Sequence, residues 1–220
     1  MGRLSTLFSP DRVAVVGATD SDGAVGRAIT ENLQASFAGD IVAVNPYKDS
    51  VLGLPCHDSV SDVDADVDVA VIVVPPDVAV DSIREAGAAG IDNVVVITAG
   101  FGETGTEGAA REKDLKAAAA EYDLNLVGPN SLGIMSTPTG LNATFGNEMA
   151  TSGGISFMSQ SGAFVTAVLD WAAERDVGFK DIVSLGNKAV LDERDFIDEW
   201  GDDPDTDVIL GYLEDIDDGE

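Results

Sequence analysis

The sequence has little of what secreted, membrane-bound or disulfide-stabilised proteins need. Its 220 residues include one cysteine, Cys56, so no disulfide can form within the chain. The longest apolar run, Val69–Val74 followed by two prolines, is far shorter than the roughly 20 residues that cross a bilayer. Residues 1–12 also lack the apolar stretch of a secretory signal. We therefore expect a cytoplasmic protein that does not associate with membranes.

Basic residues are equally scarce. Only 12 Lys and Arg face 40 Asp and Glu, and the formal net charge is -28. Nucleic-acid binding is disfavoured, because neutralising phosphates requires a basic patch. The acids are spread along the chain and are mostly aspartate, which predicts a halophilic surface whose self-repulsion is screened by concentrated salt. An acidic surface for a basic partner is the alternative, although the acids cluster only near the C-terminus, within 202–207 and 215–220.

What is present predicts a folded α/β protein of one or two domains, since 45% of the residues are hydrophobic and 24 are glycine. Short β-branched runs alternate with amphipathic stretches, as in parallel sheets built from βαβ units. Five strands are expected in the first part, at 13–16, 41–44, 69–74, 94–98 and 124–127. Helices are expected at 24–35, 78–89 and 107–121, and none is expected between 46 and 68. Residues 1–130 should therefore form one doubly wound domain.

A second α/β pattern follows a stretch rich in Gly, Thr, Pro and Asn. We expect residues 131–150 to be a linker and residues 151–220 to begin another domain. Three strands are expected there, at 154–159, 182–185 and 208–213, with helices at 162–175 and 193–200. The last strand, V-I-L-G-Y-L, is too apolar for an exposed edge. This domain is therefore expected to be incomplete, with its edge covered by further chain or by association into an oligomer.

Small and polar residues follow each strand of the first domain, and ligands of open parallel sheets bind outside those carboxyl ends. Gly17, Ala18 and Thr19 lead towards a helix start, which predicts a phosphate cradle. The glycines at 17, 23 and 26 do not form G-x-G-x-x-G, and Asn45 and Pro46 stand where an NAD site needs an acid. Nearby Lys48 suits an additional phosphate, which leaves NADP or the 3′-phosphate of coenzyme A. A surface lysine without a ligand is the simpler alternative.

The second domain has its own anion-site candidate at a strand-to-helix junction. Hydroxyls and backbone amides gather there at the positive end of a helix dipole, in the run Ser159, Gln160, Ser161 and Gly162. Ordinary N-capping by one of the serines would explain the same residues without a ligand. Neither Cys56 nor His57 belongs to a metal-ligand or nucleophile pattern, so no metal site is expected.

Taken together, the motifs resemble those of the NDP-forming acyl-CoA synthetase family, relatives of the α subunit of succinyl-CoA synthetase. They occur in the family's order over nearly the whole chain. They are L-F-S-P-D-R-V-A-V-V-G-A-T (7–19), A-V-N-P (43–46), I-V-V-P-P (72–76), I-T-A-G-F-G-E (97–103), L-V-G-P-N-S-L-G-I (126–134), M-S-Q-S-G-A (158–163), S-L-G-N-K (184–188) and G-Y-L-E (211–214). The resemblance implies a Rossmann-like CoA-binding domain followed by part of a flavodoxin-like, succinyl-CoA ligase-like α/β domain.

The resemblance also implies the reaction and the roles of residues. Such enzymes convert an acyl-CoA, ADP and phosphate to the acid, CoA and ATP through an acyl phosphate and a phosphohistidine. CoA-binding roles fall on Gly17, Ala18, Thr19, Val25, Gly26, Asn45, Pro46, Lys48, Pro75, Gly100 and Phe101. Asn130 would lie near the thiol and the acyl phosphate, and the run 159–162 would hold the phosphoryl group. Glu214 would hydrogen-bond the phosphorylated histidine.

Two parts of that reaction are not found in this sequence. The family's phosphorylated histidine lies beyond G-Y-L-E, and His57 does not match it in position. The ATP-grasp module that binds ADP or ATP with Mg would lie on a longer chain or a β subunit. The expected substrate is acetate or another short-chain acid. The alternatives are a noncatalytic CoA-binding regulatory module and an NADP-dependent oxidoreductase.

Overall fold

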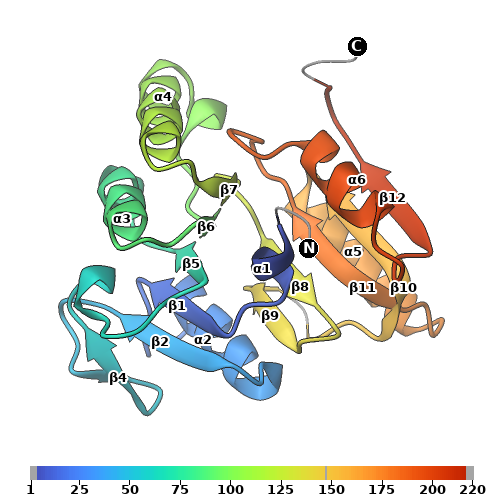
Figure 1. Cartoon of the computed structure of the whole chain (residues 1–220), viewed down its shortest axis with the longest axis horizontal. Coiled ribbons are helices and arrows are strands. Elements are labelled where there is room, and N and C mark those ends of the chain that lie inside the picture. Colours follow the sequence, from blue (N-terminus) through green and yellow to red (C-terminus); the bar gives the residue numbers. More distant parts are fainter. Residues whose placement is uncertain (1–3, 147, 217–220) are drawn as a thin grey trace.

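Two β-sheets stand next to each other in the computed structural model, which describes residues 4–146 and 148–216 (Figure 1). The first sheet has seven strands in the order β3-β4-β2-β1-β5-β6-β7. Their bounds are Arg12–Val16 (β1), Asp40–Val44 (β2), Ser50–Val51 (β3), Leu54–His57 (β4), Val69–Ile72 (β5), Asn93–Val96 (β6) and Asn125–Val127 (β7). Because β1 pairs in parallel with both β2 and β5, the strand order reverses at β1. Ligands of open parallel sheets bind beside such a reversal.

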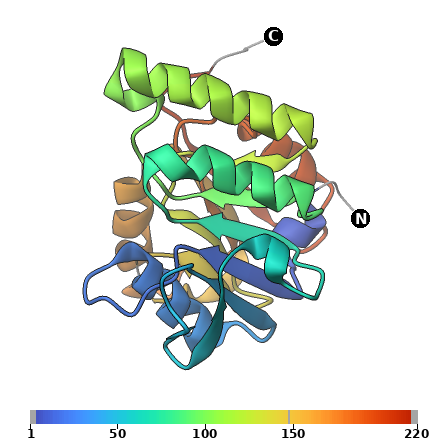
Figure 2. The same cartoon turned by 90° about the vertical axis from the view of Figure 1, so that its left-hand side faces the viewer.

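Helices cover both faces of this sheet, which is why its strands are continuous apolar runs. The helices are Val25–Ser36 (α2), Pro76–Ala88 (α3) and Thr106–Glu121 (α4), with short 3-10 turns at Val60–Asp62 (η1) and Gly102–Thr104 (η2). Val13 and Val15 of β1 belong to the same apolar cluster as Ile29 of α2. The alternate residues Ala14 and Val16 belong to the cluster of α3 and α4, which lie side by side (Figure 2).

The expected strands and helices of the first domain are confirmed, with differences at their ends. β5 and β6 end two residues early, and residues 73–74 and 97–98 line a cleft instead of extending the ladder. The region 46–68 lacks an α-helix, as expected, but holds β3, η1 and β4. His57 ends β4, and its carbonyl accepts a hydrogen bond from the Asn45 amide at 2.9 Å.

The second sheet has five strands in the order β12-β10-β11-β8-β9. They are Gly133–Ser136 (β8), Leu141–Thr144 (β9), Ser152–Ser159 (β10), Phe179–Ser184 (β11) and Val208–Tyr212 (β12), with helices Gly162–Ala173 (α5) and Glu193–Gly201 (α6). The expected linker 131–150 thus contains the antiparallel pair β8 and β9. Its turn residues close a hairpin whose flanking residues, such as Ile134 and Leu141, are fully buried. β12 is an edge strand, and its Val208 and Leu210 are 53% and 42% exposed.

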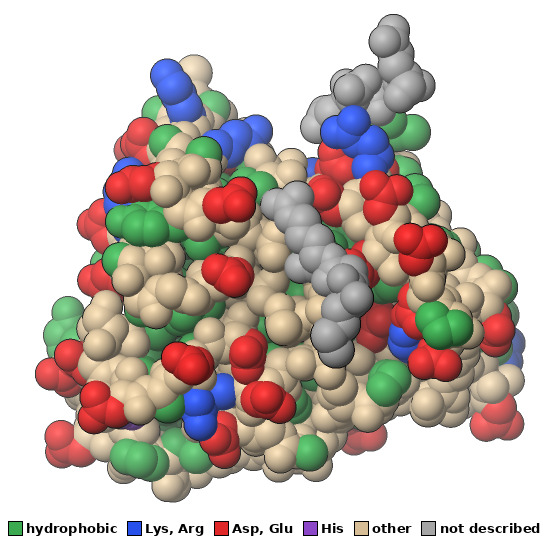
Figure 3. Space-filling view, in the orientation of Figure 1, with side chains coloured by type: hydrophobic (Ala, Val, Ile, Leu, Met, Phe, Trp, Pro, Cys, Tyr) green, Lys and Arg blue, Asp and Glu red, His purple; other side chains and the backbone are tan. Residues whose placement is uncertain are grey.

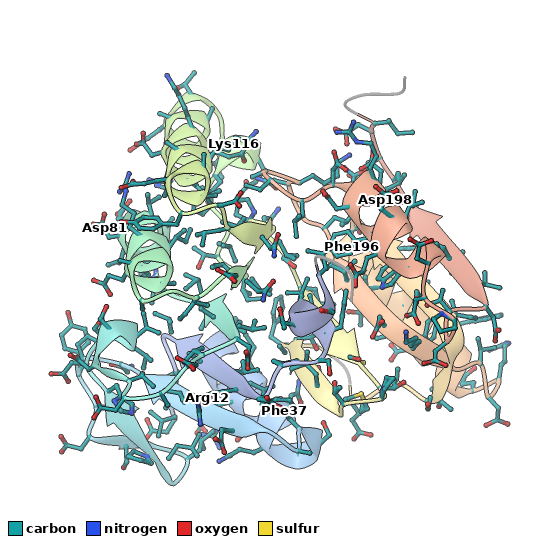
Figure 4. All side chains as sticks on the ribbon, in the orientation of Figure 1. Arg12, Phe37, Asp81, Lys116, Phe196 and Asp198 are labelled. Carbon is teal, nitrogen blue, oxygen red and sulfur yellow. The ribbon has the colours of Figure 1, made fainter. Side chains whose placement is uncertain are left out.

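The two sheets share one core. One apolar cluster joins residues of β1, β5 and α2 to residues of β8, β9, β11 and α6. The short N-terminal helix Ser5–Phe8 (α1) lies between the sheets, where Phe8 packs edge-on against Phe196 of α6 at 6.2 Å (Figure 4). Asn32 of α2 donates to the carbonyl of Thr144 in β9 at 2.8 Å.

Residues 185–191 cross from the second sheet to the first and hydrogen-bond to both. The Leu185 amide donates to Ser159 of β10 at 2.8 Å. Farther along, the Ala189 and Leu191 amides donate to Gly128 and Leu126 at 3.0 and 3.1 Å. We call residues 185–191 the crossing segment. Because its bonds are to both sheets, it fixes the distance between their carboxyl ends.

The surface is acidic over the whole face shown in Figure 3, where Asp and Glu side chains are scattered and outnumber Lys and Arg. Several cations are paired with acids, for example Arg12 with Asp40 and Arg27 with Asp22 and Glu31. Within residues 4–146 and 148–216, no helix combines the length and the hydrophobicity that crossing a membrane requires.

A buried carboxyl on β11 gives a first testable prediction. Asp181 is only 4% exposed, and burial raises its pKa above the usual value. The folded state therefore binds this proton more tightly than the unfolded state, so stability falls as pH rises from about 4 through the raised pKa. Replacing Asp181 with Asn should raise the thermal midpoint at pH 8 by a few °C, roughly the shift that 1 kcal/mol gives in a chain of this size.

Thermal unfolding at pH 8 and pH 3.5 checks this prediction. The advantage of Asp181→Asn should vanish at the lower pH, where the wild-type carboxyl is protonated in both states. Asp114→Asn, at an exposed position of α4, is the matched control and should change little. An equal or lower midpoint for Asp181→Asn at pH 8 would contradict the argument.

Candidate functional site

A cleft of about 790 Å³ lies between the carboxyl ends of the two sheets. The first sheet and α2 contribute Val25, Val73, Val74, Ile97, Thr98 and Ala99 to its wall. The connection after β7, the second sheet and α5 contribute Asn130, Ser131, Leu132, Phe145, Gln160, Ser161, Gly162, Ala163, Thr166 and Glu214. The structure therefore brings together predicted residues that lie up to 189 positions apart, from Val25 to Glu214.

The start of α2 has the features of a phosphate site. Gly17 has a φ of 101°, and a Cβ placed on it would lie 2.7 Å from the carbonyl oxygen of Val73. A Cβ on Gly26 would lie 2.3 Å from the carbonyl oxygen of Gly17. No side chain caps the first turn of this 12-residue helix at Ala24. The close approach and the uncapped amides fit an anionic group seated on the helix start.

The loop after β2 closes the side of this phosphate site. The Asn45 side chain donates to the carbonyl of Ala18 at 2.7 Å, so it holds the two loops together. Lys48 forms an ion pair with Asp20 at 2.5 Å, and this hydrogen bond lowers the pKa of Asp20. Lys48 thus lies near the loop that leads into α2, where an acid pairs with it. A bound phosphate would compete with Asp20 for the ammonium group.

Carboxylates hold the loop after β6 in place, and the side chain of Phe101 does not face a ligand. The Phe101 side chain is fully buried in the core beside α4, so only its backbone can border a ligand. Glu103 accepts hydrogen bonds from the amides of Gly100 and Phe101 at 2.5 and 3.1 Å. Burial alone would raise the pKa of Glu103, but the hydrogen bonds from Asn187, Gly100 and Phe101 outweigh it and the pKa is lowered.

Asn187 of the crossing segment ties this loop to Asn130. Its side-chain nitrogen donates to Glu103 at 2.6 Å and to Glu112 of α4 at 2.9 Å. Its side-chain oxygen accepts from the Asn130 side chain at 3.3 Å. Asn130 adopts a left-handed conformation, with a φ of 58°. Sequence analysis missed Asn187 as a site residue, although the motif S-L-G-N-K contained it.

Some of the polar groups at the junction between β10 and α5 already form hydrogen bonds with one another. Ser161 caps α5 by accepting from the Phe164 amide at 3.3 Å, and the buried Ser159 hydroxyl bonds the backbone of Ser161. N-capping, the alternative weighed for this run, therefore does account for Ser161. The first amides of the helix remain, and those of Gly162 and Ala163 lie where the cleft wall is formed.

Gln160 holds the chain around Glu214. Its side-chain oxygen accepts from the amides of Glu214 and Asp215 at 2.5 and 3.1 Å, and its nitrogen donates to the Asp215 carboxylate at 2.5 Å. The oxygen and one hydrogen of the Gln160 amide thus bond residues 214 and 215. Gln160 therefore holds the chain that carries Glu214 at the cleft.

The other predicted residues lie outside the wall of the cleft. They are Gly17, Ala18, Thr19, Gly26, Asn45, Pro46, Lys48, Pro75, Gly100, Phe101 and Ser159. Most of them belong to the loops around the start of α2 and after β6. The arrangement therefore has two parts, the uncapped helix start of α2 and a cleft that ends at Asn130, Glu214 and the start of α5.

A doubly covered parallel sheet with an uncapped, glycine-lined helix start at its strand reversal, joined across a cleft to a second helix start, is typical of proteins that bind phosphorylated ligands. The family models are more specific. Residues 11–137 match a CoA binding domain, and residues 152–220 match the succinyl-CoA ligase-like flavodoxin domain. The chain belongs to the CoA-binding domain family, and its second domain is of the succinyl-CoA ligase-like type.

Individual relatives agree with this assignment. The chain is 46% identical over 216 residues to the ADP-forming acetate–CoA ligase I of Archaeoglobus fulgidus, covering 98% of this chain and 31% of the relative. It is 38% identical to the α subunit of the ADP-forming acetate–CoA ligase II of Pyrococcus furiosus, covering 98% of this chain and 47% of the subunit.

A solved structure is similar over the whole chain. The dinucleotide-forming acetyl-coenzyme A synthetase 1 of Ca. Korarchaeum cryptofilum, in complex with phosphate and ADP, superposes with a TM-score of 0.95 and 42% identity. The superposition covers 100% of this chain and 47% of that one. The chain thus spans between 31% and 47% of the length of these relatives.

Proposed function

We propose that this chain is the CoA-binding and phosphoryl-site part of an ADP-forming acyl-CoA synthetase. The reaction would convert an acyl-CoA, ADP and phosphate to the acid, CoA and ATP, with acetate or another short acid as product. The observation that carries the proposal is the cleft between the two sheets, where Asn130, Glu214 and the start of α5 meet. This meeting supports a phosphoryl site within reach of the end of a CoA molecule that would lie along the first domain.

Residues at different positions along the cleft would have different roles. The uncapped start of α2 and Lys48 would hold the phosphates of CoA, and the backbone of Pro75, Gly100 and Phe101 would border its pantetheine arm. When bound, CoA supplies the thiol that carries the acyl group. Asn130 would donate a hydrogen bond to the acyl oxygen, and the amides of Gly162 and Ala163 would stabilise the transferring phosphoryl group. Glu214 would orient the phosphorylated histidine of another part of the enzyme.

The proposal extends to an ADP-binding part, to the assembly of the enzyme and to its salt environment. An ATP-grasp domain or β subunit would bind ADP or ATP with Mg, and the separate α subunit of the Pyrococcus furiosus relative supports such a division. The exposed apolar residues of β12 support an oligomer or a larger assembly. The scattered acids and the net charge of -28 support a cytoplasm rich in salt.

Calorimetric titration of the chain with CoA, acetyl-CoA and NADPH in roughly 2 M KCl tests the CoA-binding half of the proposal, since such salt screens surface charge. CoA and acetyl-CoA should bind saturably and NADPH should not. Replacing Lys48 with Met should weaken CoA binding about 10-fold. A hydrogen bond between charged groups contributes roughly 1.5 to 3 kcal/mol, and competition from Asp20 for the ammonium group offsets part of it. Lys113→Met, on the exposed side of α4, is the matched control.

The outcomes separate the candidate functions. NADPH binding without CoA binding would replace the proposal with an oxidoreductase. CoA binding together with failure of the complete protein to incorporate labelled phosphate in the presence of acetyl-CoA would leave a noncatalytic CoA-binding module. The expected salt requirement is tested by repeating the titration at 0.1 M KCl and recording circular dichroism at the same salt concentration. Loss of the helix signal at low salt would support the requirement.

A further inference from the structure

Lys188 carries a charge in a place where charges are costly. Its side chain is only 2% exposed, whereas those of Lys48 and Lys180 are 32% and 13% exposed. An ammonium group in the interior needs acceptors for each of its hydrogens. Lys188 has three, the carboxylate of Glu193 at 3.1 Å, the carboxylate of Asp215 at 3.0 Å and the carbonyl of Asp215 at 3.0 Å.

Charge and geometry agree that the group stays protonated. Burial alone would lower the pKa of Lys188, but Asp215 and Glu193 outweigh it and raise the pKa above its ordinary value. The backbone of the crossing segment aims the side chain inward, since Gly186 and Lys188 both have left-handed conformations with φ of 58° and 51°. Lysine rarely adopts this conformation, so the surrounding contacts hold it there.

The contacts of Lys188 lead to the cleft in two steps. Lys188 holds the Asp215 carboxylate and carbonyl, and the same carboxylate accepts from Gln160 at 2.5 Å. Gln160 in turn accepts from the amide of Glu214. Gln160 and Glu214 line the cleft, whereas Lys188 and Asp215 do not. The lysine therefore lies behind the site and touches residue 214 only through its neighbours.

We propose that Lys188 is a positioning residue that fixes Glu214 at the cleft through Asp215 and Gln160. The inference rests on the proposed function, because Glu214 acts on the phosphoryl group only if the protein is a synthetase. Residues 213–216 follow the edge strand β12, and the lysine ties them to the start of α6 through Glu193. Without it, among the described residues Gln160 would be left to hold the backbone that carries Glu214.

The test uses the complete synthetase with Lys188→Met, and with Lys188→Arg as the conservative variant. Steady-state kinetics should show kcat lowered by about 10- to 100-fold, the scale for slight misplacement of a reacting group, with KM for CoA nearly unchanged. Hydrogen–deuterium exchange should show faster exchange at the amides of Glu214 and Asp215. Lys188→Arg should recover much of both, and Lys113→Met should match the wild type.

A second variant guards against misfolding, since Lys188→Met leaves Glu193 buried without its partner. Asp215 is 66% exposed, so Asp215→Ala removes the carboxylate contacts with Lys188 and Gln160 without burying an unpaired charge, while the bond from Lys188 to the carbonyl of residue 215 remains. It should reproduce part of the loss of kcat and of the faster exchange at Glu214. Wild-type exchange or wild-type kcat in Asp215→Ala, with an active wild-type enzyme, would overturn the positioning role alone. A wild-type enzyme without synthetase activity would instead overturn the proposed function.

Discussion

Replacing Glu214 with Gln should lower kcat of the complete synthetase by about 100- to 1,000-fold, the scale of losing an acid-base group, while CoA affinity stays within about twofold. Glutamine keeps the size of the side chain, and the backbone bond from residue 214 to Gln160 does not depend on the carboxylate. What is lost is the negative charge that would hydrogen-bond the histidine and stabilise its protonated form. The CoA phosphate site proposed at the start of α2 lies on the other side of the cleft and is not changed.

Two measurements separate this effect from a general loss of structure. Calorimetric titration with CoA reports on the first domain, and incorporation of labelled phosphate from acetyl-CoA and phosphate reports on the phosphoryl site. Glu121→Gln, at the exposed end of α4, provides the control. A Glu214→Gln enzyme that incorporates phosphate as fast as the wild type would show that the carboxylate has no role in the transfer.

Adding one methyl group at Gly26 should weaken CoA binding by about 10- to 100-fold. The new Cβ would lie 2.3 Å from the carbonyl oxygen of Gly17, closer than any real contact allows. Either the Gly17 loop moves away from the helix or α2 shifts its start, and both changes disrupt the phosphate site. Such overpacking also costs about 1 to 3 kcal/mol of stability, so the folded fraction must be verified.

The matched control for Gly26→Ala is Gly201→Ala at the end of α6, where an added Cβ would meet nothing within 4 Å. Both variants are titrated with CoA after their thermal midpoints have been measured. Gly201→Ala should bind CoA like the wild type. If Gly26→Ala also binds CoA normally while folded, the start of α2 is not the phosphate site.

Much of the fold could be predicted because burial on both faces of a parallel sheet leaves a plain sequence signal. The runs around Val13, Val69 and Val94 form β1, β5 and β6, all of them buried. The hairpin of β8 and β9 escaped prediction because its turn has the composition of a linker. β8 pairs with β11, whose residues are more than 40 positions away, and β9 pairs with β8.

Site residues could be predicted where a motif directly follows a strand. They were harder to predict where the role of a residue depends on a contact with another part of the chain. Asn130, Ser161 and Glu214 were expected from their motifs and do line one cleft. The side-chain roles of Phe101 and Gln160 differ from those expected, since one is buried in the core and the other holds Glu214. Asn187 and Lys188 act through carboxylates from distant elements, and such pairings leave no local pattern in a sequence.

The crossing segment also determines how the chain could be divided. A cut between 146 and 152 would remove from the first part the donors that meet the carbonyls of Leu126, Gly128 and Pro129. The second part would carry those same amides on residues 187, 189 and 191 with no acceptors, and its β11 would lose the pairing with β8. Each fragment would thus display the hydrogen-bonding complement of the other, which makes the halves candidates for noncovalent reassembly rather than for independent use as a CoA-binding module.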